Sequence, residues 1–496
     1  MAPADSDRTY GNWRKPTSPG IGQLGLVGTL LLLGGLVACV ITMMFSLLAA
    51  LILAACIACA LLPMLLRDRN GRTGLQTVTT WLSWLRGRRA GQHLYRSGPL
   101  GLSYAGQFQL PGLAAASTMV NATDSYGRDF GLIVVPATGH YTAVFEASAD
   151  GAALVDADQV DTWVAYWGQW LAALAYEPAL VAASVVIETA PDLGTRLERE
   201  VHGNLSPDAP ELAAAVLSDV VRTYPAGSAQ VSTRIAVTYA AAPRGGRRRS
   251  TEAMAREVGT RLPGLTAGLS MTGAGAVRPM TSSELAEAIR IAYDPACHQM
   301  LESARSAGHP IGLAWEQVGP AAAQESWDHY RHDSGISVTW GMSEAPRGEV
   351  LSGVLTELLA PHRDITRKRV ALLYRPYDPA SAARLVERDR RDARFRLGGA
   401  HAAARDSVAV AAADQSAREE AKGAGLVRFA MLVTATVPTL EDLPAAAAAI
   451  DVLAPPARIR LRRMYGAQAP AFAAALPLGL VLPDHLQVPQ TIREAM

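Results

Sequence analysis

The sequence predicts an α+β protein that begins with a two-helix transmembrane hairpin and continues into a cytosolic region of repeated helix-strand units. Two observations lead to this prediction. Residues 24–66, a run of 43, contain no charged side chain. The rest of the chain alternates between helical and strand periodicities. At 496 residues, the chain is long enough for two or three folded units beyond the apolar run.

The apolar run is roughly twice the ~20 helical residues that cross the hydrocarbon core of a membrane. We expect one helix near Leu24–Thr42 and a second near Phe45–Leu66, with a turn between them. Gly34 and Gly35 lie within the first helix, where they would let the partner helix approach closely. A re-entrant segment broken at these glycines is the alternative.

Basic residues flank the run on both sides, and positive residues are retained on the cytoplasmic side of a membrane. We therefore expect a multi-pass protein of the cytoplasmic (inner) membrane with both termini in the cytoplasm. Residues 73–89 are expected either to rest on anionic lipids as an interfacial helix or to form a solvated linker. The predicted membrane-interface residues are Trp13, Arg14, Lys15, Arg67, Arg69, Arg72, Trp81, Trp84, Arg86, Arg88 and Arg89.

Helix and strand patterns alternate through the remainder of the chain. Residues 158–175 have a helical pattern that places Trp163, Trp167 and Trp170 on one face, and residues 181–188 have the pattern of a buried strand. Residues 231–239 alternate as a half-buried strand does. The order of helix then strand recurs twice after residue 350, which favours sheets covered on one face by helices.

These patterns divide the chain into a cytosolic tail (1–23), the transmembrane hairpin (24–66), a basic juxtamembrane segment (67–97) and two α+β cytosolic units (98–245 and 246–496). In the second unit, residues 380–420 are rich in Ala, Arg, Asp and Glu and are interrupted at Gly398 and Gly399. This composition predicts a protruding helical hairpin with a solvated face. Such a hairpin is either a partner-binding arm or a plain surface feature.

Catalytic signatures are missing from the sequence. The Gly-Ala-Gly segments at 273–275 and 423–425 lack the Lys-Ser/Thr that follows a phosphate-binding loop. In the polar cluster 328–333, His329 and His332 would share a face if it were helical, but no third metal ligand is identifiable. Cys297 and His298 are neighbours without an orienting partner. We therefore predict no enzyme activity, no catalytic residue, no metal and no cofactor.

Two basic clusters stand out as possible contacts to a partner or to nucleic-acid phosphates. The alternative is ordinary charge on exposed loops and strand starts, because no aromatic platform accompanies either cluster. The residues are Arg247, Arg248 and Arg249 in the first cluster and Arg363, Arg367, Lys368 and Arg369 in the second.

Several stretches resemble the PrgI-like membrane proteins of conjugative elements in high-GC Gram-positive bacteria. Residues 10–16, Tyr-Gly-Asn-Trp-Arg-Lys-Pro, lead through Pro19 and Gly20 into the apolar run as in that family. Residues 355–376, which contain the run Pro-His-Arg-Asp-Ile-Thr-Arg-Lys-Arg, are also similar to it. The strand at 426–438 and the segment at 465–477 extend the resemblance.

The resemblance implies a two-span membrane subunit fused to the N-terminal, non-motor domain of conjugative type IV secretion ATPases, ending about where the motor would begin. It implies a scaffold that docks a separate hexameric secretion ATPase during DNA transfer. Other membrane channel subunits, anionic lipids and further copies of the chain would be partners, and direct nucleic-acid contact is left open. Two alternatives are a membrane component of a type VII protein secretion apparatus and a membrane-anchored enzyme that uses residues 328–333.

Overall fold

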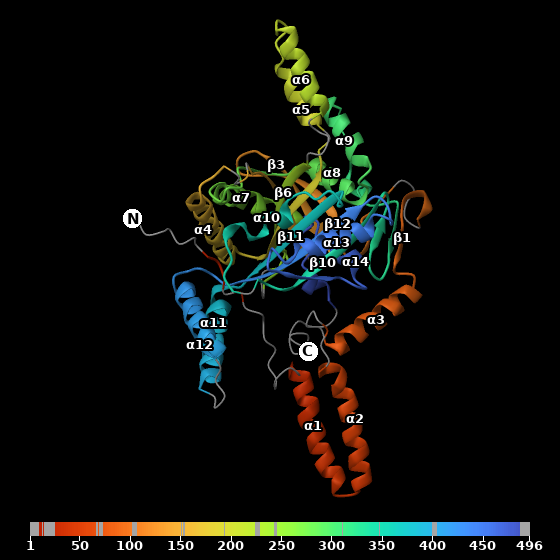
Figure 1. The fold of residues 1–496 in the computed structure, drawn as a ribbon, viewed down its shortest axis with the longest axis vertical. Coiled ribbons are helices and arrows are strands. Elements are labelled where there is room, and N and C mark those ends of the chain that lie inside the picture. Colours follow the sequence, from red (N-terminus) through yellow and green to blue (C-terminus); the bar gives the residue numbers. More distant parts are fainter. Residues whose placement is uncertain are drawn as a thin grey trace.

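The structure is a computed structural model that describes residues 9–11, 13, 25–65, 68, 73–101, 107–149, 151, 154–192, 194–223, 229–242, 246–309, 311–346, 348–398 and 404–486. Its described strands form one antiparallel sheet with helices on both faces (Figure 1). In the order of the sheet, the strands are β1 (Leu94–Arg96), β8 (Ala322–Glu325), β9 (Tyr330–His332), β10 (Gly335–Glu344), β12 (Val427–Val437), β11 (Arg367–Pro376), β5 (Leu180–Pro191), β6 (Ala229–Ala240), β4 (His140–Ser148), β3 (Asp129–Val135) and β2 (Thr118–Thr123). Two short strands lie off this path: β7 (Ala276–Pro279) pairs with β4, and β13 (Arg460–Arg463) pairs with β10.

The sheet consists of two copies of one arrangement. In the first repeat, residues 118–279, the strands lie in the order β2-β3-β4-β6-β5 with β7 paired to β4. In the second repeat, residues 322–463, the corresponding order is β8-β9-β10-β12-β11 with β13 paired to β10. The order of elements along the chain is also shared. Each repeat has a helical arm, between β5 and β6 or between β11 and β12, and then a further helix that precedes its short strand off the path. The fold is therefore an internal structural duplication.

The two repeats meet edge to edge through antiparallel pairing of β5 with β11, where Val186 faces Ala371 at the middle of the seam. Equivalent positions carry equivalent chemistry. Thr142, the third residue of β4, shares a 3.0 Å hydrogen bond with Thr238 of β6. The third residue of β10, Ser337, shares one of 2.7 Å with Thr436 of β12. All four hydroxyl-bearing residues are buried, so each pair satisfies polar groups that would otherwise be costly to bury.

Corresponding helices cover one face of the sheet in both repeats. In the first repeat these are α4 (Ala157–Ala173) and α7 (Thr251–Ser270), which pack on β3 to β6. In the second they are α10 (Thr356–Leu359) and α13 (Leu443–Leu453), which pack on β10 to β12. The opposite face is buried beneath α8 (Ser282–Tyr293) and α14 (Gln468–Ala474). Burial of both faces explains the nearly continuous apolar character of the central strands.

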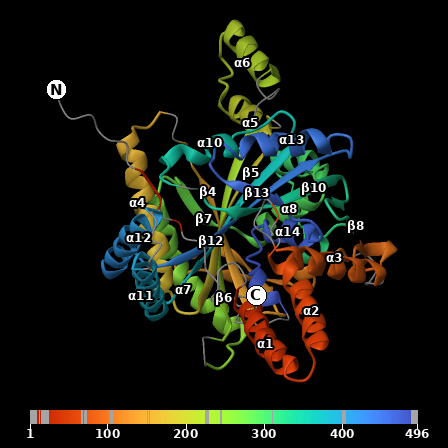
Figure 2. The same cartoon turned by 60° about the horizontal axis from the view of Figure 1, so that its bottom comes forward.

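The two helical arms project from opposite ends of the molecule (Figure 1). The first consists of α5 (Thr195–Asn204) and α6 (Glu211–Thr223), whose base lies against α9 (Cys297–Ser306). The second consists of α11 (Pro379–Leu397) and α12 (Ala404–Ala421), which lie side by side in both views (Figure 2). These two helices lie in the stretch near residues 380–420 where the sequence predicts a helical hairpin. The predicted unit boundary at residue 245 falls between β6 and α7.

The N-terminal apolar run forms α1 (Gly25–Met43) and α2 (Leu47–Leu65), which pair as a hairpin ahead of α3 (Gly74–Arg89). The prediction that this hairpin is transmembrane is wrong: among the described residues, no helix is both long and apolar enough to cross a membrane. A turn divides the uncharged run into two helices of 19 residues. At 1.5 Å per residue each is about 28.5 Å long, and α2 contains Pro63.

The predicted inner-membrane, multi-pass localisation depended on two spans, and the same finding contradicts it. The physical reason for the error is that an uncharged run of residues shows the composition of a segment but not the length of the helices within it. Whether that run makes a span depends on where the chain turns, and the turn at residues 44–46 is only weakly marked in the sequence.

Candidate protein-interaction site

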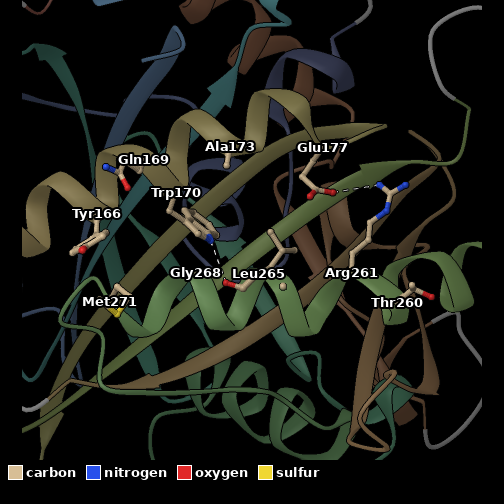
Figure 3. A pocket seen from close by; sticks show the side chains of 11 residues that line it. Tyr166, Gln169, Trp170, Ala173, Glu177, Thr260, Arg261, Leu265, Gly268 and Met271 are labelled. Carbon is tan, nitrogen blue, oxygen red and sulfur yellow. Dashed lines mark hydrogen bonds and ion pairs between the residues drawn. The ribbon is translucent and has the colours of Figure 1, made fainter. Parts of the chain in front are cut away.

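An open groove lies between α4 and α7, which together cover one face of the sheet in the first repeat (Figure 3). We call it the α4–α7 groove, and its volume is about 570 Å³. Its lining comes almost entirely from these two helices. The lining residues are Tyr166, Gln169, Trp170, Ala173, Glu177, Thr260, Arg261, Gly264, Leu265, Gly268 and Met271.

The floor of the groove is apolar and rigidly held. Trp170 is 5% exposed, stacks on Trp167 with 5.1 Å between ring centroids, and donates a hydrogen bond of 3.2 Å to the Leu265 carbonyl. Gly268 faces this indole so closely that a Cβ there would lie 2.9 Å from its Cδ1 atom. At Gly264, by contrast, a Cβ would meet nothing within 4 Å. The groove is hollow at this point because α7 lacks a side chain there.

One end of the groove is charged, and the other is lined by the uncharged residues Tyr166, Gln169 and Met271 (Figure 3). At the charged end, Arg261 lies 3.6 Å from Glu177 and donates a 2.5 Å hydrogen bond to Glu257 of its own helix. At the other end Met271 follows α7, and its side chain is 51% exposed. An apolar floor with a few convergent polar groups is typical of recognition sites, and two helical walls suit an amphipathic helix.

The corresponding helices of the second repeat, α10 and α13, pack into a buried apolar cluster. Leu358 of α10 and Ile450 of α13 are fully buried and belong to one cluster with Val433 of β12. Ala446 of α13 is also fully buried. The helix α10 has 4 residues where α4 has 17, so the second repeat has no wall of equal length at the position of α4.

Three residues of the second basic cluster lie within the fold. Arg367 and Arg369 of β11 form ion pairs with Glu188 of β5, and Lys368 donates to the Ala360 carbonyl. All three are at most 7% exposed, so a nucleic acid outside the sheet would not reach them. Burial opposes ionisation of Glu188, but the guanidinium groups of Arg369 and Arg367 hold its pKa well below the usual value. Burial lowers the pKa of Lys368 to about 8.

The other predicted basic contacts lie nearer the surface. The Arg363 side chain is 90% exposed, and Arg247 and Arg248 are exposed as well. Arg249 is only partly exposed, because it pairs with Glu257 and donates to backbone carbonyls at the end of β6.

Of the predicted membrane-interface residues, Arg14, Lys15, Arg67, Arg69 and Arg72 lie outside the described residues, and Trp13 is partly buried. On α3, Trp81 is 49% exposed, and Arg86, Arg88 and Arg89 are exposed. Trp84 packs edge-on against Trp327 with 5.2 Å between ring centroids. Trp84 therefore attaches α3 to the second repeat.

In the polar cluster at 328–333, a loop leads into β9, so His329 and His332 do not share a helix face. His329 contacts Asp328 at 2.8 Å, whereas His332 is fully buried, with its ring nitrogens on the Tyr293 carbonyl and the Ser337 hydroxyl. Within the described part of the chain, no three His, Cys, Asp or Glu residues are arranged to hold a metal ion.

The neighbouring pair Cys297 and His298 begins α9. Burial raises the pKa of the Cys297 thiol to about 11, so thiolate is scarce at neutral pH. The ring of His298 lies 3.0 Å from Arg367, and burial lowers its pKa.

Comparison with known proteins finds one match, to a domain of unknown function, DUF8461, over residues 17–76. This segment includes α1 and α2 and ends just inside α3. No curated protein matches the chain. Neither finding bears on the resemblance to PrgI-like proteins or on a role in secretion, which stay predictions.

Proposed function

We propose that this chain is a scaffold subunit whose α4–α7 groove binds an amphipathic helix of a partner protein. The observation that supports the proposal is the open groove itself, which has an apolar floor between two helices and an ion pair at one end. A partner helix with apolar residues at i, i+3, i+4 and i+7 would place them over Trp170 and Leu265. A basic or acidic side chain at one end of that helix would meet the Glu177–Arg261 pair.

The sequence resemblance supplies one candidate for the partner, the separate secretion ATPase of a DNA-transfer machine. That assignment and the type VII alternative both stay predictions. The same experiment addresses them, because an ATPase would be identified by its phosphate-binding loop.

The test fills the groove without disturbing the fold. Gly264→Leu adds a side chain where a Cβ meets nothing within 4 Å, and it removes a glycine from a helix interior. Gly168→Leu is the matched control, because Gly168 of α4 also has open space around its Cβ but does not line the groove. The tagged full-length protein and both variants are purified from the native source under mild conditions, and all co-purifying chains are quantified by mass spectrometry.

We expect at least one partner to be recovered at least tenfold less with Gly264→Leu than with Gly168→Leu. Equal recovery of every co-purifying chain with the two variants would contradict the proposal. Circular dichroism and urea unfolding of the purified variants verify that both are folded.

A further inference from the structure

β2 is the terminal strand of the sheet in the first repeat, and no described strand pairs with its outer edge. Alternate residues of an antiparallel strand direct their backbone N–H and C=O groups to the same side. The Gly131 N–H of β3 points away from β2, because it donates a 2.9 Å hydrogen bond to the carbonyl of Met280, whose own N–H bonds to β4. Asn121, which faces Gly131 in the register, and Met119 therefore direct their backbone groups to the outer edge. Unpaired backbone groups along such an edge form a template for an extended chain.

In the second repeat the corresponding edge is covered. There β8 has the place that β2 has in the first repeat, and β1, which precedes both repeats, pairs with its outer edge. Glu325 of β8 is the counterpart of Met119, because each faces the residue two positions before the end of the next strand. The Glu325 N–H donates a 2.8 Å hydrogen bond to the His93 carbonyl, directly before β1, whereas the Met119 N–H has no backbone acceptor among the described residues. The fold thus shows what covers this kind of edge, a short antiparallel strand from outside the repeat.

A pocket of about 470 Å³ lies beside the beginning of β2. Its lining includes residues 115–118, which lead into the strand. By the same correspondence, residues 116–118 are the counterparts of residues 322–324, which β1 faces in the second repeat. The pocket therefore opens at the residues beside which a strand equivalent to β1 would lie.

The pocket is suited to a long basic side chain. Trp315 forms one wall and is held by a 3.1 Å hydrogen bond from its indole to the Ser117 hydroxyl, and Leu110 adds apolar surface. Among the residues that line the pocket, only Glu316 is charged, and it is exposed. Lys and Arg combine an apolar stem with a cationic head, so either would place its stem against Trp315 and its charge near Glu316.

We propose that an extended segment of a partner protein pairs with the outer edge of β2 and places a Lys or Arg side chain in the pocket beside Glu316. In this mode of recognition, backbone hydrogen bonds supply affinity and side-chain pockets supply specificity. The paired length is short because α7 closes the far end of the edge, where a Cβ at Gly259 would lie 2.9 Å from the Thr123 carbonyl. The segment lies beside residues 116–121, separate from the α4–α7 groove, and the inference does not depend on the proposed function.

The test selects peptides and then removes single features of the edge. A displayed library of random peptides is selected on the purified protein carrying Gly264→Leu, which fills the α4–α7 groove, and binding is measured by fluorescence polarisation in this background. Met119→Pro removes the outward N–H at an edge position that accepts proline, and Met119→Ala is the matched control because it also lacks the methionine side chain. Glu316→Lys reverses the charge at the pocket. Its control is Glu441→Lys, at an exposed position in the second repeat.

We expect the enriched peptides to share a Lys or Arg flanked by residues that favour strands. Met119→Pro should weaken their binding about tenfold relative to Met119→Ala, and Glu316→Lys should weaken it about tenfold relative to Glu441→Lys. Equal binding within either matched pair would overturn the proposal, as would a selection that enriches no peptide. Dimerisation of the unliganded chain that Met119→Pro abolishes would assign the edge to a second copy and would also overturn it.

Circular dichroism verifies that Met119→Pro is folded, and a second measurement does not depend on this variant. The enriched peptides are methylated at one backbone nitrogen at a time. Strand pairing predicts that methylation weakens binding at alternate positions only, because one edge of the peptide faces β2 and the other faces solvent. Equal tolerance of methylation at every position would contradict pairing along the edge.

Discussion

The two repeats share a strand order and differ in what their helices do. In the second repeat, α10 and α13 pack into a closed core, and the helices of its arm cover each other. In the first repeat, α4 and α7 leave a groove of about 570 Å³, and α6 keeps an apolar face exposed. One copy of the fold therefore has its helices arranged for stability, and the other has surfaces suited to partners. The following predictions test this comparison in order of expected effect.

The largest effect is expected at the seam between the repeats. Glu188→Gln keeps the shape of the side chain but leaves the buried guanidinium groups of Arg367 and Arg369 without a counter-ion. Removing one partner of a buried ion pair costs about 3–5 kcal/mol of unfolding free energy, measurable by urea denaturation. Glu146→Gln is the control, because its pair with Arg278 lies at the surface and should matter by less than about 1 kcal/mol. Equal losses would mean that the seam is not held by this cluster.

The helix layers of the two repeats should respond differently to truncation. Ile450→Ala empties part of the closed core of the second repeat and should lower the unfolding free energy by about 2–5 kcal/mol. Met271→Ala at the mouth of the groove removes a half-exposed side chain and should change it by about 0.5 kcal/mol or less. Comparable losses in urea titrations of the two variants would show that the groove is not open.

A buried histidine of the second repeat makes the stability of the fold depend on acid. Burial lowers the pKa of His332 to about 4, so this residue stays neutral in the fold while the unfolded chain takes up a proton near pH 6.5. Stability contributed by the neutral ring is thus lost as pH falls from about 6.5 towards 4. Linkage predicts a loss of about 2 kcal/mol between pH 7 and pH 5.

The control for His332 comes from the first repeat. His332 ends β9 and faces Gly335, and its counterpart Val135 ends β3 and faces His140. His332→Val introduces valine, the residue found at the corresponding position 135 of the first repeat. It should remove most of the loss of unfolding free energy that His332 causes between pH 7 and pH 5, whatever its effect on stability at pH 7. An unchanged pH 7 to pH 5 difference in unfolding free energy would exclude His332 as its source.

The smallest predicted effect is a gain. Gly264→Ala replaces a glycine inside α7 whose Cβ position is open and should raise the unfolding free energy by about 0.5–1 kcal/mol. Gly268→Ala should lower it, because its Cβ would lie 2.9 Å from Trp170. Thermal unfolding of the two variants separates these outcomes. A loss at Gly264 would mean that this glycine is required by the fold and not by the groove.

Local periodicity was enough to predict several elements of the fold. The alternation at residues 231–239 corresponds to β6, and the helical pattern at 158–175 corresponds to α4. The duplication was not predictable, because strand pairing joins residues such as Val186 and Ala371 that are 185 positions apart (371 − 186). Local patterns carry no information on such register.

Charge patterns fail as predictors of exposure for a related reason. Arg367 and Arg369 were expected at the surface, but their counter-ion, Glu188, belongs to a strand of the other repeat. The α4–α7 groove was missed as well. Its signal is the pair Gly264 and Gly268, four residues apart in a helix that also contains Gly259 and Pro263. Only the packed position of Trp170 reveals which of them opens the surface.

The most direct test of the central claim compares exposed positions near the C-terminal ends of α7 and α13. A photo-reactive amino acid is placed at Met271 beside the groove or at Val452 on α13, which are 51% and 69% exposed. Both proteins are then irradiated in the native source. We predict that Met271 yields a specific covalent adduct with a partner protein, that Gly264→Leu in the same chain abolishes this adduct, and that Val452 yields none. Adducts of equal yield at both positions, or adducts at Met271 unaffected by Gly264→Leu, would contradict the account.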